Sequence, residues 1–377
     1  MVSGAAFPRH GLCPGAGRRN RVVRPGHRFR PGSAPVAPDG KALRVAATEV
    51  SVIAPARLHM GFFGLQGGGP GRCFGSLGLT LADLALRLRV RQALRLQVRG
   101  PMAGRVREVV ESLCVHLDLP QSMEIVVEKA IPPHMGLGSG TQLALAVGSA
   151  VLRLHGMQMP PAELASLLGR GKRSGIGVGA FCYGGLLADG GSGAATVVPP
   201  VVSRLEFPEE WRLLLMLDHS RHGFSGNRER RSFESLPELP MTTVSHLCRL
   251  VLLQALPAVC ERRIQDFGAA IGEIQQILGG HFAAVQGGSY TSPEVAAAMR
   301  WLVAEGAAGV GQSSWGSTGF ALFPSEEQAS GVLRQGLIRW RGHAQLELRM
   351  VSGRNRGAEI EGGEPATGVK SSRRPAC

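Results

Sequence analysis

The sequence of 377 residues has no C-x-x-C pair, the spacing most typical of zinc-binding and redox-active cysteines. A disulfide framework in a small secreted domain is equally disfavoured, because the seven cysteines are scattered without a regular spacing. Reduced thiols in a cytosol are the default for such a pattern, so we expect a cytoplasmic protein. The cysteines are Cys13, Cys73, Cys114, Cys182, Cys248, Cys260 and Cys377.

Long apolar runs are also lacking. The longest, around Leu250–Leu256, follows Arg249 and ends before Pro257, whereas a membrane-spanning helix needs roughly 20 predominantly apolar residues. The first 40 residues contain no apolar stretch of the kind found in a secretory signal. We therefore expect no membrane partner.

Acidic residues are fewer than basic ones, 28 against 42, which gives a net charge of +14. Residues 1–48 hold much of this surplus, with nine Lys or Arg against one acid, Asp39. Their Arg-, Pro- and Gly-rich composition predicts a disordered basic extension, and residues 353–377 are predicted to form a flexible tail. A basic nucleic-acid-binding protein is the rival class, but charge held in the tails supports it weakly, so we expect no nucleic-acid partner.

The body of the chain mixes strand and helix patterns without strict alternation, which predicts an α+β fold. Apolar residues and arginines alternate over Leu84–Val98, as in a half-buried strand with a solvated basic face. A helix is predicted over Ala103–Leu117, and a mainly helical region with a break near Pro257 over Thr242–Gly280. A strand is predicted over Met123–Ile131 and a buried strand over Arg212–Leu217.

A glycine-rich loop lies between the strand at Met123–Ile131 and an apolar helix. Glycines allow backbone N–H groups to converge, and the helix N-terminus adds partial positive charge, so the loop suits a phosphate or pyrophosphate. An ordinary strand–helix turn with a Ser or Thr cap remains the alternative. The residues of this loop are Gly136, Gly138, Ser139, Gly140 and Thr141.

This loop, P-P-H-M-G-L-G-S-G-T, resembles the phosphate loop P-x-x-x-G-L-G-S-S-A of the GHMP kinases. Ala54–Gly61 resembles their N-terminal P-G-R-V-N-L-x-G motif, and Gly309–Phe320 lies where their C-terminal glycine-rich motif lies. The resemblance implies a GHMP-kinase-type two-domain fold. Residues 49–200 would form a domain like ribosomal protein S5 domain 2, and residues 201–352 a ferredoxin-like domain.

One departure separates the chain from the mevalonate-kinase branch, whose P-S-G-x-D segment supplies an aspartate base. Here Lys172–Gly177 reads K-R-S-G-I-G, so Gly177 stands at the position of that base. The segments around Ala54, Gly136, Arg173 and Gln312 instead resemble the beta-ribofuranosylaminobenzene 5'-phosphate synthases. That family condenses phosphoribosyl pyrophosphate with 4-aminobenzoate or 4-hydroxybenzoate and releases CO2 and pyrophosphate, in methanopterin biosynthesis.

The resemblance implies Mg²⁺ as cofactor, a para-substituted benzoate as acceptor and a homodimer, since the family is commonly dimeric. An ATP-dependent GHMP-family kinase of small molecules remains the alternative activity. The phosphate loop would hold one phosphate group, while Arg173 and Ser174 suit another phosphate or the benzoate carboxylate. A surface salt bridge is the alternative for Arg173.

Four residues are predicted to be catalytic. Arg57 and His59 alternate on one side of an extended segment, so both are candidates to face the cleft, and a structural role is the alternative for His59. Asp189 and Asp218 each follow a strand, where a carboxylate holds a metal ion or stabilises a turn. A flat benzoate is predicted to contact a segment with amide, hydroxyl and aromatic groups, although core packing is the alternative for its tryptophan. This segment is Gln312, Ser313, Ser314 and Trp315; no metal ligands are assigned.

Overall fold

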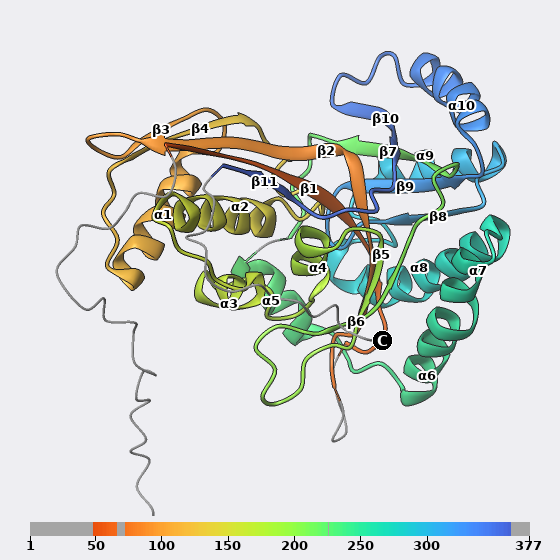
Figure 1. The fold of residues 1–377 in the computed structure, drawn as a ribbon. Coiled ribbons are helices and arrows are strands. Elements are labelled where there is room, and N and C mark those ends of the chain that lie inside the picture. Colours follow the sequence, from red (N-terminus) through yellow and green to blue (C-terminus); the bar gives the residue numbers. More distant parts are fainter. Residues whose placement is uncertain (1–47, 66–71, 225, 363–377) are drawn as a thin grey trace, which may run out of the picture. The chain divides into compact units, whose positions relative to one another are not determined.

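The structure, a computed structural model, describes residues 48–65, 72–224 and 226–362 (Figure 1). These residues belong to one compact unit. The predicted extension, apart from Thr48, and the last part of the predicted tail lie outside the described residues.

A sheet of seven strands forms the first layer of the described fold, with β1 and β2 at its centre. β1 pairs with β11 and β2, β2 with β4 and β5, and β5 with β6, all antiparallel, while β3 runs parallel to β4. The strands are β1 (Glu49–Phe62), β2 (Ser76–Gln92), β3 (Gln97–Arg99), β4 (Met123–Lys129), β5 (Leu186–Asp189), β6 (Val201–Leu205) and β11 (Glu359–Glu361).

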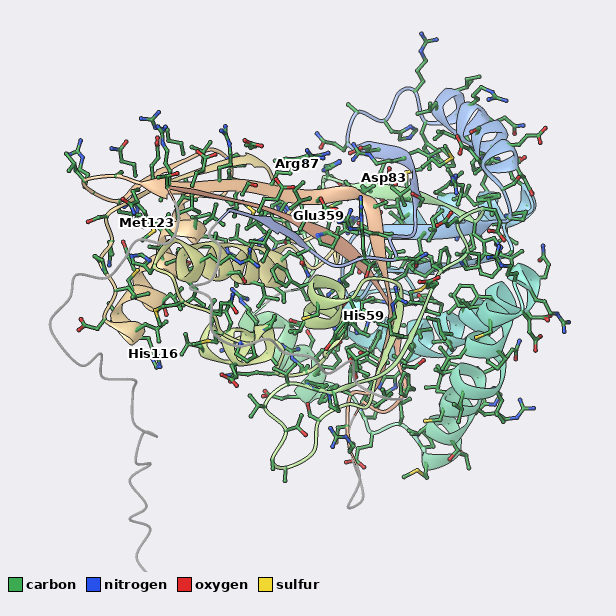
Figure 2. All side chains as sticks on the ribbon, viewed as in Figure 1. His59, Asp83, Arg87, His116, Met123 and Glu359 are labelled. Atoms are coloured by element: carbon green, nitrogen blue, oxygen red, sulfur yellow. The ribbon has the colours of Figure 1, made fainter. Side chains whose placement is uncertain are left out.

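The alternation predicted for Leu84–Val98 is confirmed in β2, where Leu86 and Leu88 are buried and Arg87 and Arg89 are exposed. Figure 2 marks Arg87 on this solvated face. Arg89 pairs with Glu128 of β4 at 2.5 Å. The basic face of β2 is therefore a wet sheet surface with arginines paired to acids on the neighbouring strand.

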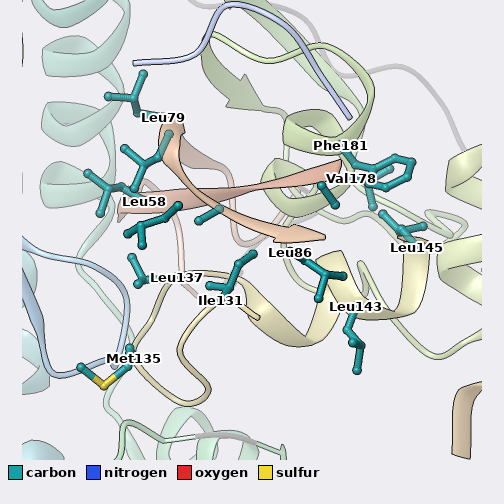
Figure 3. Close-up of a cluster of buried hydrophobic side chains, with 14 of the residues drawn as sticks. Leu58, Leu79, Leu86, Ile131, Met135, Leu137, Leu143, Leu145, Val178 and Phe181 are labelled. Atoms are coloured by element: carbon teal, nitrogen blue, oxygen red, sulfur yellow. The ribbon is translucent and has the colours of Figure 1, made fainter. Parts of the chain in front are cut away.

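Helices cover the other face of this sheet, and α2 lies against both β1 and β2 (Figure 1). Their apolar side chains form a buried cluster that includes Leu58 of β1, Leu137 of the glycine-rich loop and Leu143 of α2 (Figure 3). Burial of these leucines fixes where the loop enters α2. The helices are α1 (Ala103–Leu117), α2 (Ser139–Leu154), α3 (Pro161–Leu167) and α4 (Ile176–Cys182).

A second, antiparallel sheet has the strand order β10-β7-β9-β8, and α8, α9 and α10 pack on it. Ser292 caps α9 by accepting a hydrogen bond from the Val295 N–H. The strands are β7 (Arg212–Asp218), β8 (Gly309–Gln312), β9 (Thr318–Phe323) and β10 (Leu346–Ser352). The helices are α5 (Gly226–Ser235), α6 (Met241–Leu250), η1 (Val251–Ala255, a π-helix), α7 (Leu256–Cys260), α8 (Ile264–Gln286), α9 (Pro293–Ala304) and α10 (Glu326–Arg339).

The continuous helical run Met241–Cys260 has the length and apolar composition of a membrane span, with a mean hydropathy of 1.4. It packs along α8 through buried residues such as Leu247 and Leu250, while Leu252 and Leu253 are exposed. The helical region predicted over Thr242–Gly280 is present, but its break lies between Cys260 and Ile264 rather than at Pro257, which is near the N-terminus of α7.

Two predicted boundaries need correction. β6 begins at Val201 and pairs with β5, so the first sheet extends past the boundary at residue 200. β11 pairs with β1 through Glu359–Glu361, so the ordered chain extends past the tail boundary at residue 352. Both segments add a strand to the first sheet beyond the predicted boundary. The composition along the sequence does not show which earlier strand a later segment pairs with.

Candidate active site

The glycine-rich loop owes its shape to two glycines in the left-handed region, Gly136 at φ +77° and Gly138 at φ +79°. A Cβ on Gly136 would lie 2.1 Å from the carbonyl oxygen of Ser313, so no side chain fits there. Gly138 precedes Ser139, the first residue of α2, and places Gly140 and Thr141 in its first turn. The N-terminus of a 16-residue helix therefore ends at this loop, with the partial positive charge that suits a phosphate.

Arg57 of β1 holds this loop from one side. Its backbone N–H donates to the carbonyl oxygen of Leu137 at 3.2 Å, and its Nη1 donates to that of Gly136. Burial lowers the pKa of Arg57 to about 10, with the negative charge of Glu229 opposing the shift, so the guanidinium stays charged at neutral pH. Its Nε is buried without a hydrogen-bond partner among the described residues, which leaves one donor for a ligand.

The segment Gly309–Phe320 holds the loop from the other side. Ser313 Oγ donates to the Gly136 carbonyl oxygen at 2.7 Å and accepts from the His59 N–H at 3.0 Å. The Ser314 N–H donates to the His59 carbonyl oxygen at 3.1 Å. The three motifs singled out in the sequence therefore meet at one place in the fold.

A cavity of about 570 Å³ opens beside the loop. Cationic side chains dominate its lining, and Phe74 and Phe233 add aromatic surface. Such a lining suits a ligand with several phosphate groups and a flat ring. Its charged and hydroxyl-bearing residues are Arg57, Thr141, Arg170, Lys172, Arg173, Ser174, Glu229 and Glu234.

Arg173 projects into this cavity rather than lying in a fully solvated salt bridge. Its Nη2 is 3.2 Å from Oε2 of Glu229, with the two side chains 33% and 25% exposed. Its guanidinium carbon lies 5.2 Å from the ring centroid of Phe233. Glu229 and Phe233 both come from α5, which the sequence did not reveal as a helix.

Gly177 packs directly against the phosphate loop. A Cβ on Gly177 would lie 3.1 Å from Cγ2 and 3.5 Å from Oγ1 of Thr141. Gln142, the residue after Thr141, donates its Nε2 hydrogen to the Gly177 carbonyl oxygen at 2.8 Å. A side chain at this position would therefore force Thr141 to shift by a few tenths of an ångström.

Asp189 is fully buried and accepts five hydrogen bonds from the protein itself. The donors are the N–H and hydroxyl of Ser76, the hydroxyl of Ser174, and the N–H groups of Gly175 and Gly191. Burial raises the pKa of Asp189, and these donors oppose the rise. Asp189 was predicted either to hold a metal ion or to stabilise a turn, and this geometry favours a carboxylate that holds the Ser174 turn.

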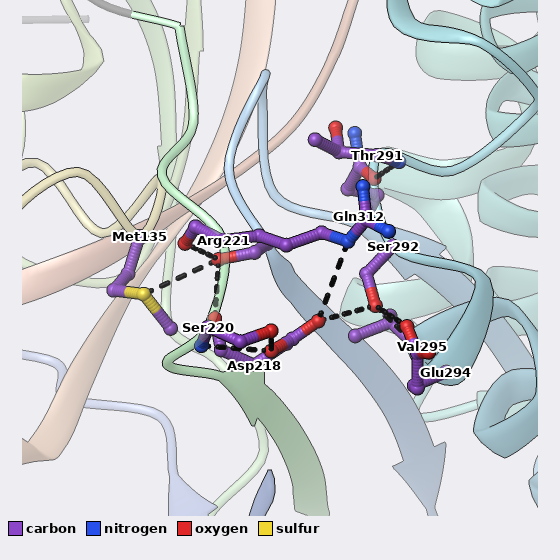
Figure 4. Close-up of polar contacts among 10 residues, drawn as sticks. Met135, Asp218, Ser220, Arg221, Thr291, Ser292, Glu294, Val295 and Gln312 are labelled. Atoms are coloured by element: carbon purple, nitrogen blue, oxygen red, sulfur yellow. Dashed lines mark hydrogen bonds and ion pairs between the residues drawn. The ribbon is translucent and has the colours of Figure 1, made fainter. Parts of the chain in front are cut away.

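Asp218 has a similar position at the end of β7 (Figure 4). It accepts hydrogen bonds from the N–H and hydroxyl of Ser220 and from the hydroxyl of Ser292 at 2.7 Å. Although burial acts to raise it, these donors and nearby Arg221 hold the pKa of Asp218 below its usual range. The carboxylate ties β7 to the start of α9, which again favours a structural role.

His59 and Arg57 do not line the same cavity, although their alternation along β1 is regular. The pairing with β2 runs without a shift from Arg57 to His59, so the two side chains lie on one side of the strand and enter different hollows along it. His59 instead lines a separate hollow of about 20 Å³. Burial, with a smaller contribution from Arg57, lowers its pKa to about 3, so its ring is neutral at physiological pH.

Trp315 and Gln312 line the same small hollow as His59. The Trp315 ring lies 4.4 Å from that of Phe282 and stacks at 5.3 Å on that of Phe224. Gln312 accepts from the Thr291 N–H and donates to the Ser314 carbonyl oxygen at 2.9 Å. These contacts favour core packing, the alternative for Trp315, over direct contact with an acceptor ring.

Metal binding by protein side chains alone finds no support in the part of the chain that the structure describes. No group of three or more His, Cys, Asp or Glu side chains converges there. Mg²⁺ commonly binds through one or two protein oxygens together with substrate phosphates. The cavity fits that arrangement, because Thr141 and Ser174 supply hydroxyl oxygens beside the cations.

Comparison with known proteins supports this description. Residues 104–185 match the GHMP kinases N terminal domain, and residues 255–340 match the GHMP kinases C terminal domain. Beta-ribofuranosylphenol 5'-phosphate synthase of Methanothermobacter thermautotrophicus is 30% identical over 332 residues, 82% of this chain and 98% of that protein. Its counterpart in Archaeoglobus fulgidus is 31% identical over 323 residues, 81% of this chain and 98% of that protein.

Solved structures agree with the fold. Homoserine kinase from Cytophaga hutchinsonii superposes with a TM-score of 0.56 at 16% identity, covering 86% of this chain and all of that one. Mevalonate diphosphate decarboxylase from Staphylococcus aureus gives a TM-score of 0.58 at 15% identity, covering 83% of this chain and 98% of that one. The α+β fold of the GHMP kinases is therefore confirmed.

Proposed function

The chain belongs to the beta-ribofuranosylphenol 5'-phosphate synthases of the GHMP kinase superfamily, and we propose that it is a decarboxylating phosphoribosyl C-glycosyltransferase. It condenses phosphoribosyl pyrophosphate with 4-hydroxybenzoate or 4-aminobenzoate and releases CO2 and pyrophosphate. Methanopterin biosynthesis is the pathway that this product serves. The name of the relatives makes 4-hydroxybenzoate the first acceptor to test.

One observation carries this proposal: Gly177 packs against Thr141, a residue of the cationic cavity, at the position where a kinase of the mevalonate type needs a base. Phosphoryl transfer to an alcohol benefits from a carboxylate that accepts the hydroxyl proton. Attack by an aromatic carbon on a ribosyl centre has no hydroxyl proton to remove. The arrangement therefore suits glycosyl transfer better than the alternative ATP-dependent kinase.

The residues of the cavity divide the work of binding the donor. The N-terminus of α2 and Arg57 face one phosphate group, and Arg170, Lys172 and Arg173 face another. Phe74 and Phe233 supply the aromatic surface against which the acceptor ring lies. Asp189 keeps the Ser174 turn in place without touching substrate.

Mg²⁺ would be held mainly by the diphosphate, and the hydroxyl oxygen of Thr141 in the cavity lining would be available as a protein ligand. When bound, the ion neutralises charge on the leaving pyrophosphate. A cytoplasmic homodimer completes the proposal, and light scattering of the purified protein measures the assembly state.

Titration calorimetry with phosphoribosyl pyrophosphate and Mg²⁺ tests the assignment of the cavity. Arg173→Gln should weaken donor binding by about tenfold or more, because a hydrogen bond to a charged group contributes roughly 1.5–3 kcal/mol. Arg87→Gln, on the solvated face of β2, is the matched control and should bind as the unaltered protein does. Equal donor affinity in both variants would remove the cavity from the proposal.

A further inference from the structure

We propose that Glu229 of α5 is a catalytic residue whose carboxylate stabilises the positive charge that develops on the ribosyl group as pyrophosphate leaves. The inference rests on the proposed function and names the residue that carries its most demanding step. Neither the motifs nor the comparisons with known proteins point to α5.

The position of Glu229 is the first argument. Its carboxylate lies 3.2 Å from Arg173 Nη2 and interacts electrostatically with Arg57, which holds the phosphate loop. It is therefore between the two sets of cations proposed to bind the two ends of the donor. A ribosyl group that bridges those ends passes beside this carboxylate.

The charge of Glu229 is the second argument, because a carboxylate in a phosphate-binding cavity repels the substrate. Burial raises the pKa of the Glu229 carboxyl, and Arg173 and Arg57 oppose that rise. The contact with Arg173 Nη2 at 3.2 Å favours the ionised form of the carboxyl. The Glu229 carboxylate weakens donor binding, so its presence needs a reason. Catalysis supplies that reason if the carboxylate stabilises the cationic transition state more than it repels the bound donor.

Elimination is the third argument. Asp189 and Asp218, the carboxylates first predicted to be catalytic, have their oxygens engaged by internal donors. Among the described residues that line the cavity, Glu229 and Glu234 are the carboxylates, and Glu234 lies at the exposed side of α5. Glu229 is therefore the carboxylate best placed to face the reacting carbon.

The step balances without any proton transfer. The bond between ribose C1 and the diphosphate oxygen breaks, and its electron pair leaves with pyrophosphate. Positive charge then spreads over C1 and the ring oxygen beside the Glu229 carboxylate, which forms no covalent bond. The ring carbon that bears the carboxylate donates its π electrons to C1. The bond to that carboxylate then breaks, its pair restores aromaticity, and CO2 leaves.

Glu229→Gln keeps the size of the side chain and removes its charge. We expect kcat to fall about 100-fold, the scale seen when one electrostatic group aimed at a transition state is removed. Donor affinity should stay the same or increase, because the repulsion of the phosphates is gone. Glu238→Gln, which changes an exposed carboxylate outside the cavity lining, is the matched control and should keep kcat within about twofold.

Glu229→Asp retains the charge on a shorter side chain, so its kcat should exceed that of Glu229→Gln. This rescue would not occur if Glu229 only filled space, and thermal unfolding of each variant verifies folding. An unchanged kcat for Glu229→Gln would overturn the inference. So would a weaker donor affinity that accounts for the whole loss, which would mean that Glu229 only positions Arg173.

Glu229 as a Mg²⁺ ligand is a further outcome against the inference. In that case Glu229→Gln would require more Mg²⁺ for half-maximal rate, whereas our account predicts an unchanged requirement. An assay of the unaltered protein distinguishes failure of this inference from failure of the proposed function. If it releases no CO2 from either benzoate, the function fails; if it does and Glu229→Gln is equally fast, only this inference fails.

Discussion

Replacing Gly138 by alanine places a methyl group 3.2 Å from Cγ and 3.3 Å from Nε of Arg57, at a φ of +79°. The left-handed backbone costs an L-residue about 1–2 kcal/mol of folding free energy. The methyl group also forces the Arg57 side chain to shift by a few tenths of an ångström, away from the Gly136 carbonyl oxygen and the helix N-terminus.

The effect on binding can be separated from the effect on folding. A misplaced guanidinium loses a charge-assisted contact to phosphate of roughly 1.5–3 kcal/mol, so donor affinity should fall about tenfold to hundredfold. Gly287→Ala is the control for strain, because Gly287 has φ +83° and no neighbour within 4 Å of its added Cβ. It should lose similar stability in thermal unfolding and bind the donor normally in calorimetry. Equal donor affinities in the two variants would refute the reasoning.

Three further predictions concern Asp189, His59 and the metal ion. Asp189→Asn turns an acceptor of the Ser174 and Gly175 donors into a donor, so stability to urea should fall by about 1–3 kcal/mol, and an unchanged midpoint would contradict its structural role. The unfolded chain protonates His59 below about pH 6.5, whereas the folded protein does so only near pH 3. Stability should therefore fall by about 1.4 kcal/mol per pH unit below 6.5, and His59→Gln should lack this loss; identical pH profiles would disprove the low pKa. Chelation with EDTA should abolish activity and Mg²⁺ should restore it, whereas full activity in EDTA would exclude the ion.

Helices and strands could be predicted from the sequence where the spacing of their apolar residues matches the positions that are buried in the fold. Helix α1 was predicted at the bounds the structure gives, and β2 keeps its alternation. Helix α4 was missed because its segment I-G-V-G-A-F-C contains two glycines, which disfavour helix, and it forms under tertiary burial. Helix α5 was missed because G-N-R-E-R-R-S-F-E-S has almost no apolar period, although an acid in its first turn was an available signal.

In the candidate site, likewise, only residues that lie in sequence motifs could be predicted. Motif order brought Arg57, Gly136 and Ser313 to one place, because each lies in a motif. Arg170 and Glu229 belong to no motif and enter the cavity only through the tertiary arrangement of α3, α4 and α5. A period of two residues along β1 places Arg57 and His59 on one side of the strand, but it does not show that two different hollows open along that side.

The most direct test of the proposed activity follows two products in one reaction. Phosphoribosyl pyrophosphate, Mg²⁺ and carboxyl-labelled 4-hydroxybenzoate or 4-aminobenzoate are incubated with the protein, and labelled CO2 and pyrophosphate are measured together. Our account predicts equal amounts of both, and none from plain benzoate, because a ring without a para donor is too weak a nucleophile. Absence of CO2 from either acceptor, with ATP-dependent phosphorylation of a small alcohol, would contradict the account and make the protein a kinase.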